Sequence, residues 1–464
     1  MAPKTLLSCP EEILRIIAEK LDFADHRKVC FVNKRLQAVV QPLLCSHIQW
    51  EYNKSQSPPI AQFLRTLIRR PDLAQCIKTI ILEGDDGFGQ RRGMYRVEND
   101  KKSQFTIDDN VALEEMVEWI EKLGSPYSKQ WIHELRTGTM DAFVALLLCL
   151  APGLRTLYLG SNYTQNSSLI GAVLHLALLD TSKAINLHSF EHLEEVTMLY
   201  HATEINTPSH TDTANAHDTL CLFYLPSIKK LSVSLDVPRS FTWPSDSPPS
   251  PTSLTSLKLY KIREEPLGHI LSVTKSLRDL EWNCFYREDL EDKYITSTLD
   301  VGKISKALSH VGGTLIDLKI FASVANGVNP EPPKLGLTKP FGVFQHLHKL
   351  EKIQVSLPFL GGFSPLDLGE GHLEGALPRN IQWVTITDDL RYQDEWEWED
   401  TDILEHLGRW LHQRTETTPF LRGLHLIITE NDFGYWEPEM IRALKSLGSR
   451  EKFHIKFTNR ADQP

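Results

Sequence analysis

Apolar residues in the opening stretch of the chain, residues 6–50, recur at the spacing of amphipathic helices. Ser8 and Glu11 have the spacing of a capping box, with Pro10 in the first helical turn, and they predict that a helix begins there. The apolar residues that follow cover more than one face of this helix: Ile13, Leu14, Ile16, Ile17 and Leu21. Such a helix needs packing partners on more than one side.

A second helical segment follows the first. Asp22 and Asp25 are suited to cap it, because short acidic side chains accept hydrogen bonds from a first turn. Its apolar positions repeat at helical spacing: Val29, Val32 and Leu36. Pro42, which has no backbone donor, is expected to close the set. A unit of roughly 40 residues rarely buries a sufficient core by itself, so we expect these helices to dock on another surface.

One short pattern recurs through the rest of the chain. Residues 154–162, LRTLYLGSN, match the leucine-rich-repeat string L-x-x-L-x-L-x-x-N at every fixed position. Weaker apolar triplets begin at Ile77, Leu193, Ile228, Leu254, Leu277, Leu315, Leu350, Ile381 and Leu421, and a degenerate strand lies at 453–457. The alternation within each triplet predicts a strand with one face toward a core.

Segments with a helical pattern separate these strands: 109–123, 167–179, 266–274, 304–311, 401–413 and 438–447. Alternating strands and helices predict an α/β fold with parallel strands joined by crossovers. The strands recur every 23 to 42 residues, roughly, against about 20 to 29 in regular leucine-rich repeats, so a doubly wound α/β fold competes. We favour an irregular leucine-rich-repeat solenoid, because the positions between the leucines repeat with them and no phosphate-binding loop follows the first strand.

Composition narrows the class of protein. Of 464 residues, 41% are hydrophobic and 24% charged, as in ordinary globular proteins, and the formal net charge of −10 argues against a nucleic-acid binder. The seven cysteines form no CxxC pair, which favours a reducing cytoplasmic or nuclear setting over a zinc site or a disulfide framework. The longest apolar run, residues 142–151, is far shorter than the roughly 20 residues that span a bilayer. We expect a soluble intracellular protein.

The first fifty residues resemble an F-box. The positions that match the family pattern, in order, are Pro10, Glu12, Ile13, Leu14, Ile17, Leu21, Asp25, Val29, Val32, Lys34, Arg35, Pro42 and Leu43. Cys9 and His26 stand where the family has leucine, which bears on the affinity of the docking surface. The resemblance covers about a tenth of the chain, the usual size of such a module. Together with the repeats, the plan resembles F-box proteins with leucine-rich repeats, including many fungal ones.

The resemblance implies a three-helix F-box over residues 1–50 and an irregular solenoid with Pro-rich loop insertions, such as 238–253, over residues 51–464. It implies binding to a Skp-type adaptor and, through it, to the cullin and RING subunits of a ubiquitin ligase. The chain would be a non-catalytic substrate receptor, without a cofactor, metal, nucleic acid or membrane partner. The implied adaptor-facing residues or their supports are Pro10, Ile13, Leu14, Ile17, Leu21, Val29, Val32, Leu36, Pro42 and Leu43. The alternatives are an F-box scaffold without ubiquitin transfer and an N-terminal cap that packs on the rest of the chain.

Two regions are candidates for binding a target protein. The first is the outward side of the predicted strands, at Tyr158, Lys258, Tyr260, Glu281 and Lys319, provided that the strand register is correct. The second is the acidic segment 388–402, DDLRYQDEWEWEDTD, in which Trp396 and Trp398 lie among carboxylates and could hold a basic peptide. We favour the simpler interpretation of this segment, a solvated loop whose tryptophans pack back onto the fold.

Two motifs keep an enzyme in consideration. Residues 188–192 fit the H-x-x-E-H string of inverted zinc peptidases, but they run directly into a predicted strand. Residues 84–89, GDDGFG, follow a strand as a dinucleotide-binding loop does, but their aspartates would repel a pyrophosphate and no helix follows. A metal- or nucleotide-dependent enzyme on a doubly wound fold is therefore the weakest alternative.

Overall fold

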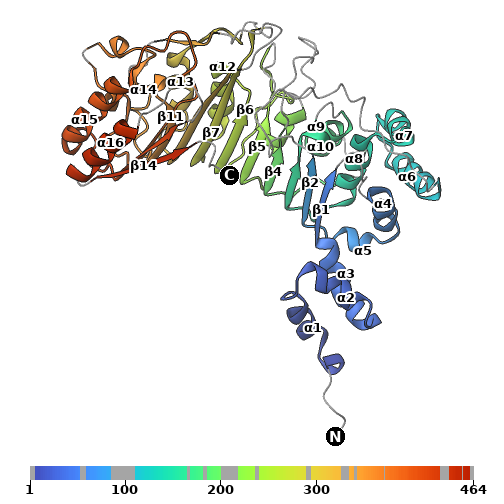
Figure 1. The fold of residues 1–464 in the computed structure, drawn as a ribbon. Helices are drawn as coiled ribbons and strands as arrows, with labels where there is room; N and C mark the ends of the chain where they lie inside the picture. Colours follow the sequence, from blue (N-terminus) through green and yellow to red (C-terminus); the bar gives the residue numbers. More distant parts are fainter. Residues whose placement is uncertain are drawn as a thin grey trace. The chain divides into compact units, whose positions relative to one another are not determined.

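The computed structural model describes residues 6–52, 59–84, 110–164, 168–180, 185, 187–199, 218–235, 240–288, 294–324, 334–338, 342–369, 371–428, 438–451 and 453–459. The chain divides into two compact units. Both contain helices and strands (Figure 1). Unit 1 comprises Met1–His201 with His217–Ile228, and unit 2 comprises Ala202–Ala216 with Lys229–Pro464. In the described residues, no helix is both long enough and apolar enough to cross a membrane.

Unit 1 begins with short helices and continues with strands that alternate with helices. Its helical elements are η1 (Leu6–Ser8), α1 (Glu11–Ala18), α2 (Phe23–Cys30), α3 (Lys34–Ser46), α4 (Ile60–Arg69), α5 (Pro71–Ala74), α6 (Asn110–Leu123), α7 (Ser128–Arg136), α8 (Met140–Leu150), α9 (Ser161–Thr164), α10 (Leu169–Leu179) and η2 (Cys221–Tyr224). Its strands are β1 (His47–Tyr52), β2 (Thr79–Gly84), β3 (Thr156–Leu159) and β4 (Glu195–Met198), and they pair in parallel in this order. Helix α8 is almost wholly buried, which explains the longest apolar run of the sequence.

The three N-terminal helices share a small core. Its buried members are Leu14, Ala18, Val39 and Val40, with half-buried apolar residues packed around them. Asp22 caps α2 by accepting the Asp25 backbone N–H at 2.7 Å, as predicted. The capping box at Ser8 was wrong: Pro10 occupies the N-cap position of α1 without a side-chain cap, and Ser8 ends the separate helix η1.

Helix α3 also differs from expectation, because Pro42 does not end it. The helix continues through Pro42 to Ser46, and β1 begins at the next residue, His47. Proline removes one helical hydrogen bond, but the remaining turn is held by other contacts. One of these contacts is a hydrogen bond at 2.9 Å, in which the backbone N–H of Lys78 donates to the Ser46 carbonyl next to the pairing of β1 with β2.

Unit 2 consists of parallel strands joined by helices or loops. Its main sheet contains β5 (Lys230–Ser234), β6 (Ser256–Tyr260), β7 (Asp279–Tyr286), β9 (Asp317–Val324), β11 (Lys352–Ser356), β12 (Trp383–Thr387), β13 (Gly423–Ile428) and β14 (His454–Asn459). A separate pair is formed by β8 (Thr298–Leu299) and β10 (Gly336–Leu337). The helical elements are α12 (Glu264–Val273), α13 (Val301–Ser309), α14 (Pro358–Gly361), η4 (Pro365–Leu368), η5 (Leu373–Ala376), α15 (Asp400–Thr417) and α16 (Pro438–Arg450).

Within each unit the strands lie side by side in chain order (Figure 1). A doubly wound sheet reverses its strand order at a switch point, and neither unit contains such a reversal among its described strands. Residues on the unit 2 strands alternate between buried and half-buried or exposed, as in β6 and β7. One face of the sheet is therefore covered, and the other, which we call the open face, is left partly exposed by the residues that the structure describes.

The predicted strand register is confirmed. All residues of the ten apolar triplets from Ile77 to Leu426 are buried, and each triplet lies on or just before a parallel strand. The degenerate last strand is β14, in which Ile455 and Phe457 are half-buried. The six predicted helices correspond to α6, α10, α12, α13, α15 and α16, with ends shifted by a few residues. Residues 240–253 form an irregular loop, as their prolines suggested.

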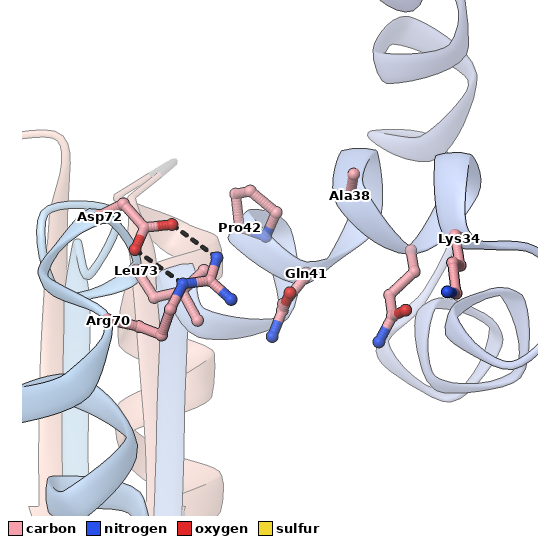
Figure 2. Close-up of a pocket in the computed structure, with 8 residues that line it drawn as sticks. Lys34, Ala38, Gln41, Pro42, Arg70, Asp72 and Leu73 are labelled. Carbon is pink, nitrogen blue, oxygen red and sulfur yellow. Dashed lines mark hydrogen bonds and ion pairs between the residues drawn. The ribbon is translucent and has the colours of Figure 1, made fainter.

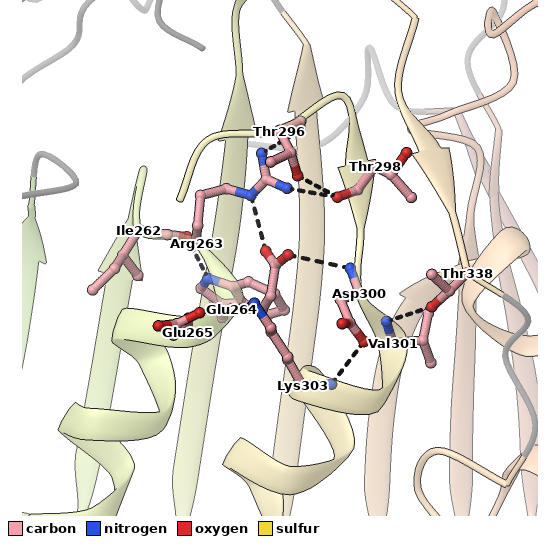
Figure 3. A network of polar contacts seen from close by, with 11 residues as sticks. Ile262, Arg263, Glu264, Glu265, Thr296, Thr298, Asp300, Val301, Lys303 and Thr338 are labelled. Atoms are coloured by element: carbon pink, nitrogen blue, oxygen red, sulfur yellow. Dashed lines mark hydrogen bonds and ion pairs between the residues drawn. The ribbon is translucent and has the colours of Figure 1, made fainter. Parts of the chain in front are cut away.

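A buried ionic network fixes the turn between β6 and α12 (Figure 3). The Arg263 side chain is fully buried; its Nε donates to Glu264 Oε2 at 2.9 Å and its Nη1 to the Thr296 carbonyl at 2.8 Å. The Asp300 backbone N–H donates to Glu264 Oε1 at 3.2 Å. Because these charges are paired and hydrogen-bonded, they hold the segment 294–300 beside α12 without an uncompensated charge in the core.

Candidate interaction surfaces

Exposed apolar side chains are concentrated on the N-terminal helices. Phe31 is 90% exposed and Val32 is 70% exposed, although soluble proteins usually cover such side chains. The other large apolar side chains exposed in this stretch are Leu6, Leu7, Ile13, Ile16, Ile17 and Phe23. These eight residues belong to a set of 14 in the described chain, and the remaining six are scattered between Val111 and Phe420. We call residues 6–32 with these side chains the N-terminal apolar surface.

The predicted adaptor-facing residues divide by exposure. Pro10, Ile13, Ile17 and Val32 are exposed; Leu21, Val29, Leu36, Pro42 and Leu43 are half-buried; Leu14 is buried. The first set is available for contact. Leu14, Val29, Leu36 and Leu43 belong to the core of the helical cluster, whereas Leu21 and Pro42 lie outside it. Sequence reasoning did not place Phe23 and Phe31 in this set. Both lie at the ends of α2, outside the apolar period of the helix, so periodicity alone could not identify them.

A hollow of about 510 Å³ lies between α3 and α5 (Figure 2). Pro42 and Ala38 line it from α3, and the Arg70–Asp72 ion pair lines it from the start of α5. The two ionic contacts of this pair are 2.8 and 2.6 Å long, and the hydrogen bond from Arg70, opposed by some desolvation, lowers the pKa of Asp72. The arginine and the carboxylate satisfy each other, so the charged group of the lining that lies outside this pair is Lys34 on α3.

Four of the five predicted target-facing strand residues lie together on the open face of unit 2. Lys258 Nζ lies 3.2 Å from Glu281 Oε2, and the Tyr260 hydroxyl donates to Glu281 Oε1 at 2.7 Å. Burial, followed by the Glu281 carboxylate, raises the pKa of Tyr260. Lys319 is the register partner of Glu281 on β9. The fifth residue, Tyr158, is half-buried on β3 of unit 1. The charges of the unit 2 group are therefore already partly neutralised.

The acidic segment 388–402 corrects one expectation. Trp398 is only 3% exposed, and its Nε1 donates to the Gly362 carbonyl at 2.9 Å, so its ring is not available to a peptide. Trp396 is half-buried and its Nε1 donates to the Trp398 carbonyl at 2.9 Å. The tryptophans pack back onto the fold, as in the simpler of the two interpretations.

A second hollow, of about 320 Å³, lies on the open face across β11–β14. Its lining residues are Lys352, Trp383, Thr385, Leu424, His425, His454 and Lys456. Sequence reasoning did not assemble this set, because its members come from four strands distributed over about a hundred residues. Correct strand register is what brings them together.

The structure describes one of the two enzyme-like motifs, the H-x-x-E-H string at residues 188–192. His188 lies in an irregular segment, its Nε2 contacts the Leu148 carbonyl at 2.9 Å, and its ring packs edge-on against Phe190. Burial lowers the pKa of His188. The part of the chain that the structure describes contains no cluster of three or more His, Cys, Asp or Glu side chains arranged for a metal. The GDDGFG motif lies outside the described residues, apart from the backbone of Gly84.

Comparison with known proteins adds no identification. No protein-family model matches the chain, and no curated protein matches it.

Proposed function

We propose that the chain is the substrate-recognition subunit of a Skp–cullin–F-box ubiquitin ligase. In this proposal the N-terminal helices are the F-box and the repeated strands form an irregular leucine-rich-repeat solenoid. The supporting observation is the N-terminal apolar surface, because exposed patches of this kind mark protein interaction sites. Four of the ten predicted adaptor-facing residues are exposed and lie within this stretch, which supports the proposal.

The energetics favour a partner on this surface. The helical cluster has only four buried residues, which is a small core for the apolar side chains that it carries. Full burial of a Val, Ile or Phe side chain contributes roughly 1.5–3 kcal/mol before the costs of association. Phe31 and Val32, 90% and 70% exposed, would contribute most of this free energy, whereas Ile13 and Ile17, 44% and 41% exposed, would contribute less than the full value. A Skp-type adaptor is the partner that the resemblance implies.

The chain would carry out no chemistry in this role. It would hold a target protein on its open sheet face and the adaptor on its N-terminal helices. Holding both in one assembly raises the effective concentration of target lysines near the ubiquitin-charged enzyme.

The proposal is tested by co-expressing the full chain with a Skp-type adaptor and isolating the complex. The test variant is Phe31→Asp with Val32→Asp, chosen because both side chains are exposed and neither supports the helical core. A control is Leu366→Asp, which adds one negative charge at another exposed apolar side chain, 83% exposed in η4 of unit 2. Circular dichroism and thermal melting establish that each variant is folded.

We expect wild type and Leu366→Asp to retain the adaptor, and the double variant to lose at least tenfold in affinity. If folded double variant binds the adaptor like wild type, or if wild type does not bind it, the F-box assignment is wrong. Addition of the cullin–RING subunits then separates a ligase from a scaffold. Association with the adaptor but no recruitment of cullin would favour the scaffold.

A further inference from the structure

Outward-facing residues of β11–β14 form two short rows on the open face of unit 2. The first row is Lys352, Trp383, Gly423 and His454. The second row is Gln354, Thr385, His425 and Lys456. The rows enclose the hollow of about 320 Å³, and we call this set of residues the β11–β14 patch.

The patch combines positive charge with a shortage of carboxylates. It contains two lysines and two histidines, and none of its eight residues is acidic. The nearest carboxylate in register is Asp317, beside Lys352 at the β9 border. Lys456 forms no ion pair with any described residue. The patch thus differs from the neighbouring Lys258–Glu281 pair, whose charges neutralise each other.

An aromatic ring forms the floor of the patch. Trp383 is 40% exposed, and its ring lies directly over Gly423 on the neighbouring strand. A Cβ atom at Gly423 would lie 2.2 Å from Trp383 Cζ3, so only glycine leaves room for this position of the ring. The far side of the ring meets the His454 ring edge-on, with centroids 6.2 Å apart. An exposed indole held flat on a sheet offers an apolar contact surface between the cationic side chains.

We propose that the β11–β14 patch binds an acidic segment of the target protein, with Glu or Asp carboxylates at Lys352, Lys456 and His454 and an apolar side chain on Trp383. This inference deepens the proposed function by naming the class of target sequence. It rests on the proposed function in one respect: that function makes the bound acidic segment part of a ligase target. Because the whole chain carries a net charge of −10, a cationic patch on it selects acidic ligands locally rather than through general attraction.

The size of the patch fits a short peptide. Four adjacent strands at about 4.8 Å spacing place the outer strands of the patch, β11 and β14, about 14 Å apart, and an extended chain advances about 3.4 Å per residue. About four residues of an extended segment therefore cross the patch. Such a segment can present two carboxylates to the flanking cations while a central side chain covers the indole.

Histidine protonation links this binding to pH. Burial, followed by the positive charges of Lys456 and His454, lowers the pKa of His425, whose Nε2 lies 2.8 Å from Thr458 Oγ1. The nearest opposing carboxylate is Asp317, at the far border of the patch. A bound carboxylate favours the protonated imidazole, so affinity should rise as pH falls from 8 to 6. Because His454 also lies in the patch, His425→Gln together with His454→Gln should flatten this dependence.

The test measures fluorescence anisotropy of two fluorescein-labelled hexapeptides with the full-length chain. The acidic probe has the sequence Glu-Glu-Leu-Leu-Glu-Glu, and the basic probe has a lysine in place of each glutamate. The variants are Lys352→Glu with Lys456→Glu, and separately Gly423→Ala. The matched control is Lys306→Glu with Lys445→Glu, which makes the same change in net charge at exposed lysines of α13 and α16.

We expect wild type to bind the acidic probe and not the basic one. The double variant in the patch should lose at least tenfold in affinity, Gly423→Ala at least threefold, and the control less than twofold. Equal losses in both double variants, or an unchanged affinity in a folded patch variant, would overturn the proposal. Adaptor binding depends on the N-terminal helices, so failure of the probe with intact adaptor binding would refute only this inference.

Discussion

Asp218 is a half-buried residue whose carboxyl group lies against helix α10, and it makes the stability of unit 1 depend on pH. A Cβ atom placed on Gly171 would lie 1.9 Å from Asp218 Cγ, so the carboxyl group rests directly on the helix backbone. Burial, followed by the negative charge of Asp141, raises the pKa of Asp218 to about 7. Asp141 lies close by because its carboxylate accepts the backbone N–H of Leu169 at 2.8 Å, at the start of the same helix.

The sign of the effect follows from the protonation of the two states. In the folded chain Asp218 keeps its proton up to about pH 7, whereas in the unfolded chain it loses the proton near pH 4. The folded state therefore binds more protons between these values, and stability falls as pH rises through this window. At 1.36 kcal/mol per pKa unit, the free energy of unfolding falls by about 4 kcal/mol at most over the whole window. We expect about 2 kcal/mol of this decrease between pH 5 and pH 8.

Asp218→Asn removes the titration and keeps the shape of the side chain. We expect this variant to be more stable than wild type at pH 8, with an advantage that shrinks by about 2 kcal/mol on going to pH 5. The assay is hydrogen exchange of the α10 amides, residues 169–179, measured by mass spectrometry at several pH values. Histidine titrations affect both proteins equally and cancel in the difference. Glu121→Gln, at an exposed position of α6, is the matched control. An advantage that does not change with pH would refute the reasoning.

Three further substitutions test the packing and capping. Trp282→Phe should lower the free energy of unfolding in urea by about 2–3 kcal/mol, because the buried Ile262 carbonyl loses the hydrogen bond from the indole Nε1, which lies 2.9 Å away. A decrease below about 0.5 kcal/mol would contradict this. Arg263→Met should cost about 3–5 kcal/mol, because it leaves the Glu264 carboxylate buried and unpaired, and adding Glu264→Gln should restore part of the loss in thermal melting. Asn33→Ala should lower the free energy of opening of α3, measured by hydrogen exchange, by about 1 kcal/mol, because the Asn33 side chain accepts the Arg35 backbone N–H at 2.7 Å. Asn33→Asp keeps this acceptor and should leave the free energy of opening unchanged.

The strands could be predicted from the sequence because their signal is local and strong. In a one-sided parallel sheet every second residue is buried, so the alternation at Leu280 and Trp282 marks both the strand and its inward face. Helix α8 lacks such a signal. Ten of its eleven residues are buried, so it has no polar face to create a helical period. The capping box failed for a related reason: Ser8 and Glu11 have the correct spacing, but the chain forms a separate turn before α1.

The candidate surfaces were less predictable because exposure depends on tertiary contacts. Trp398 lies among carboxylates in the sequence and Trp383 in the strand segment NIQWVTIT, but the first is buried and the second is exposed. Trp398 enters the core because Gly361 leaves a slot for its ring, where a Cβ would lie 2.8 Å away. Trp383 stays at the surface because its position in β12 points to the open face. Both outcomes depend on glycines outside the local window, which a periodicity argument does not weigh.

The direct succession of α3 and β1 has a consequence for the modularity of the chain. No residue separates Ser46 from His47, and β1 runs to Tyr52, so a boundary after residue 50 falls inside a strand. Excising the N-terminal helices at that point would remove most of β1 and leave β2 with an unpaired edge that invites pairing with other chains. The N-terminal helices are therefore not an exchangeable cassette. A transplant or deletion that respects the fold must carry the whole first strand and replace the edge protection that it gives.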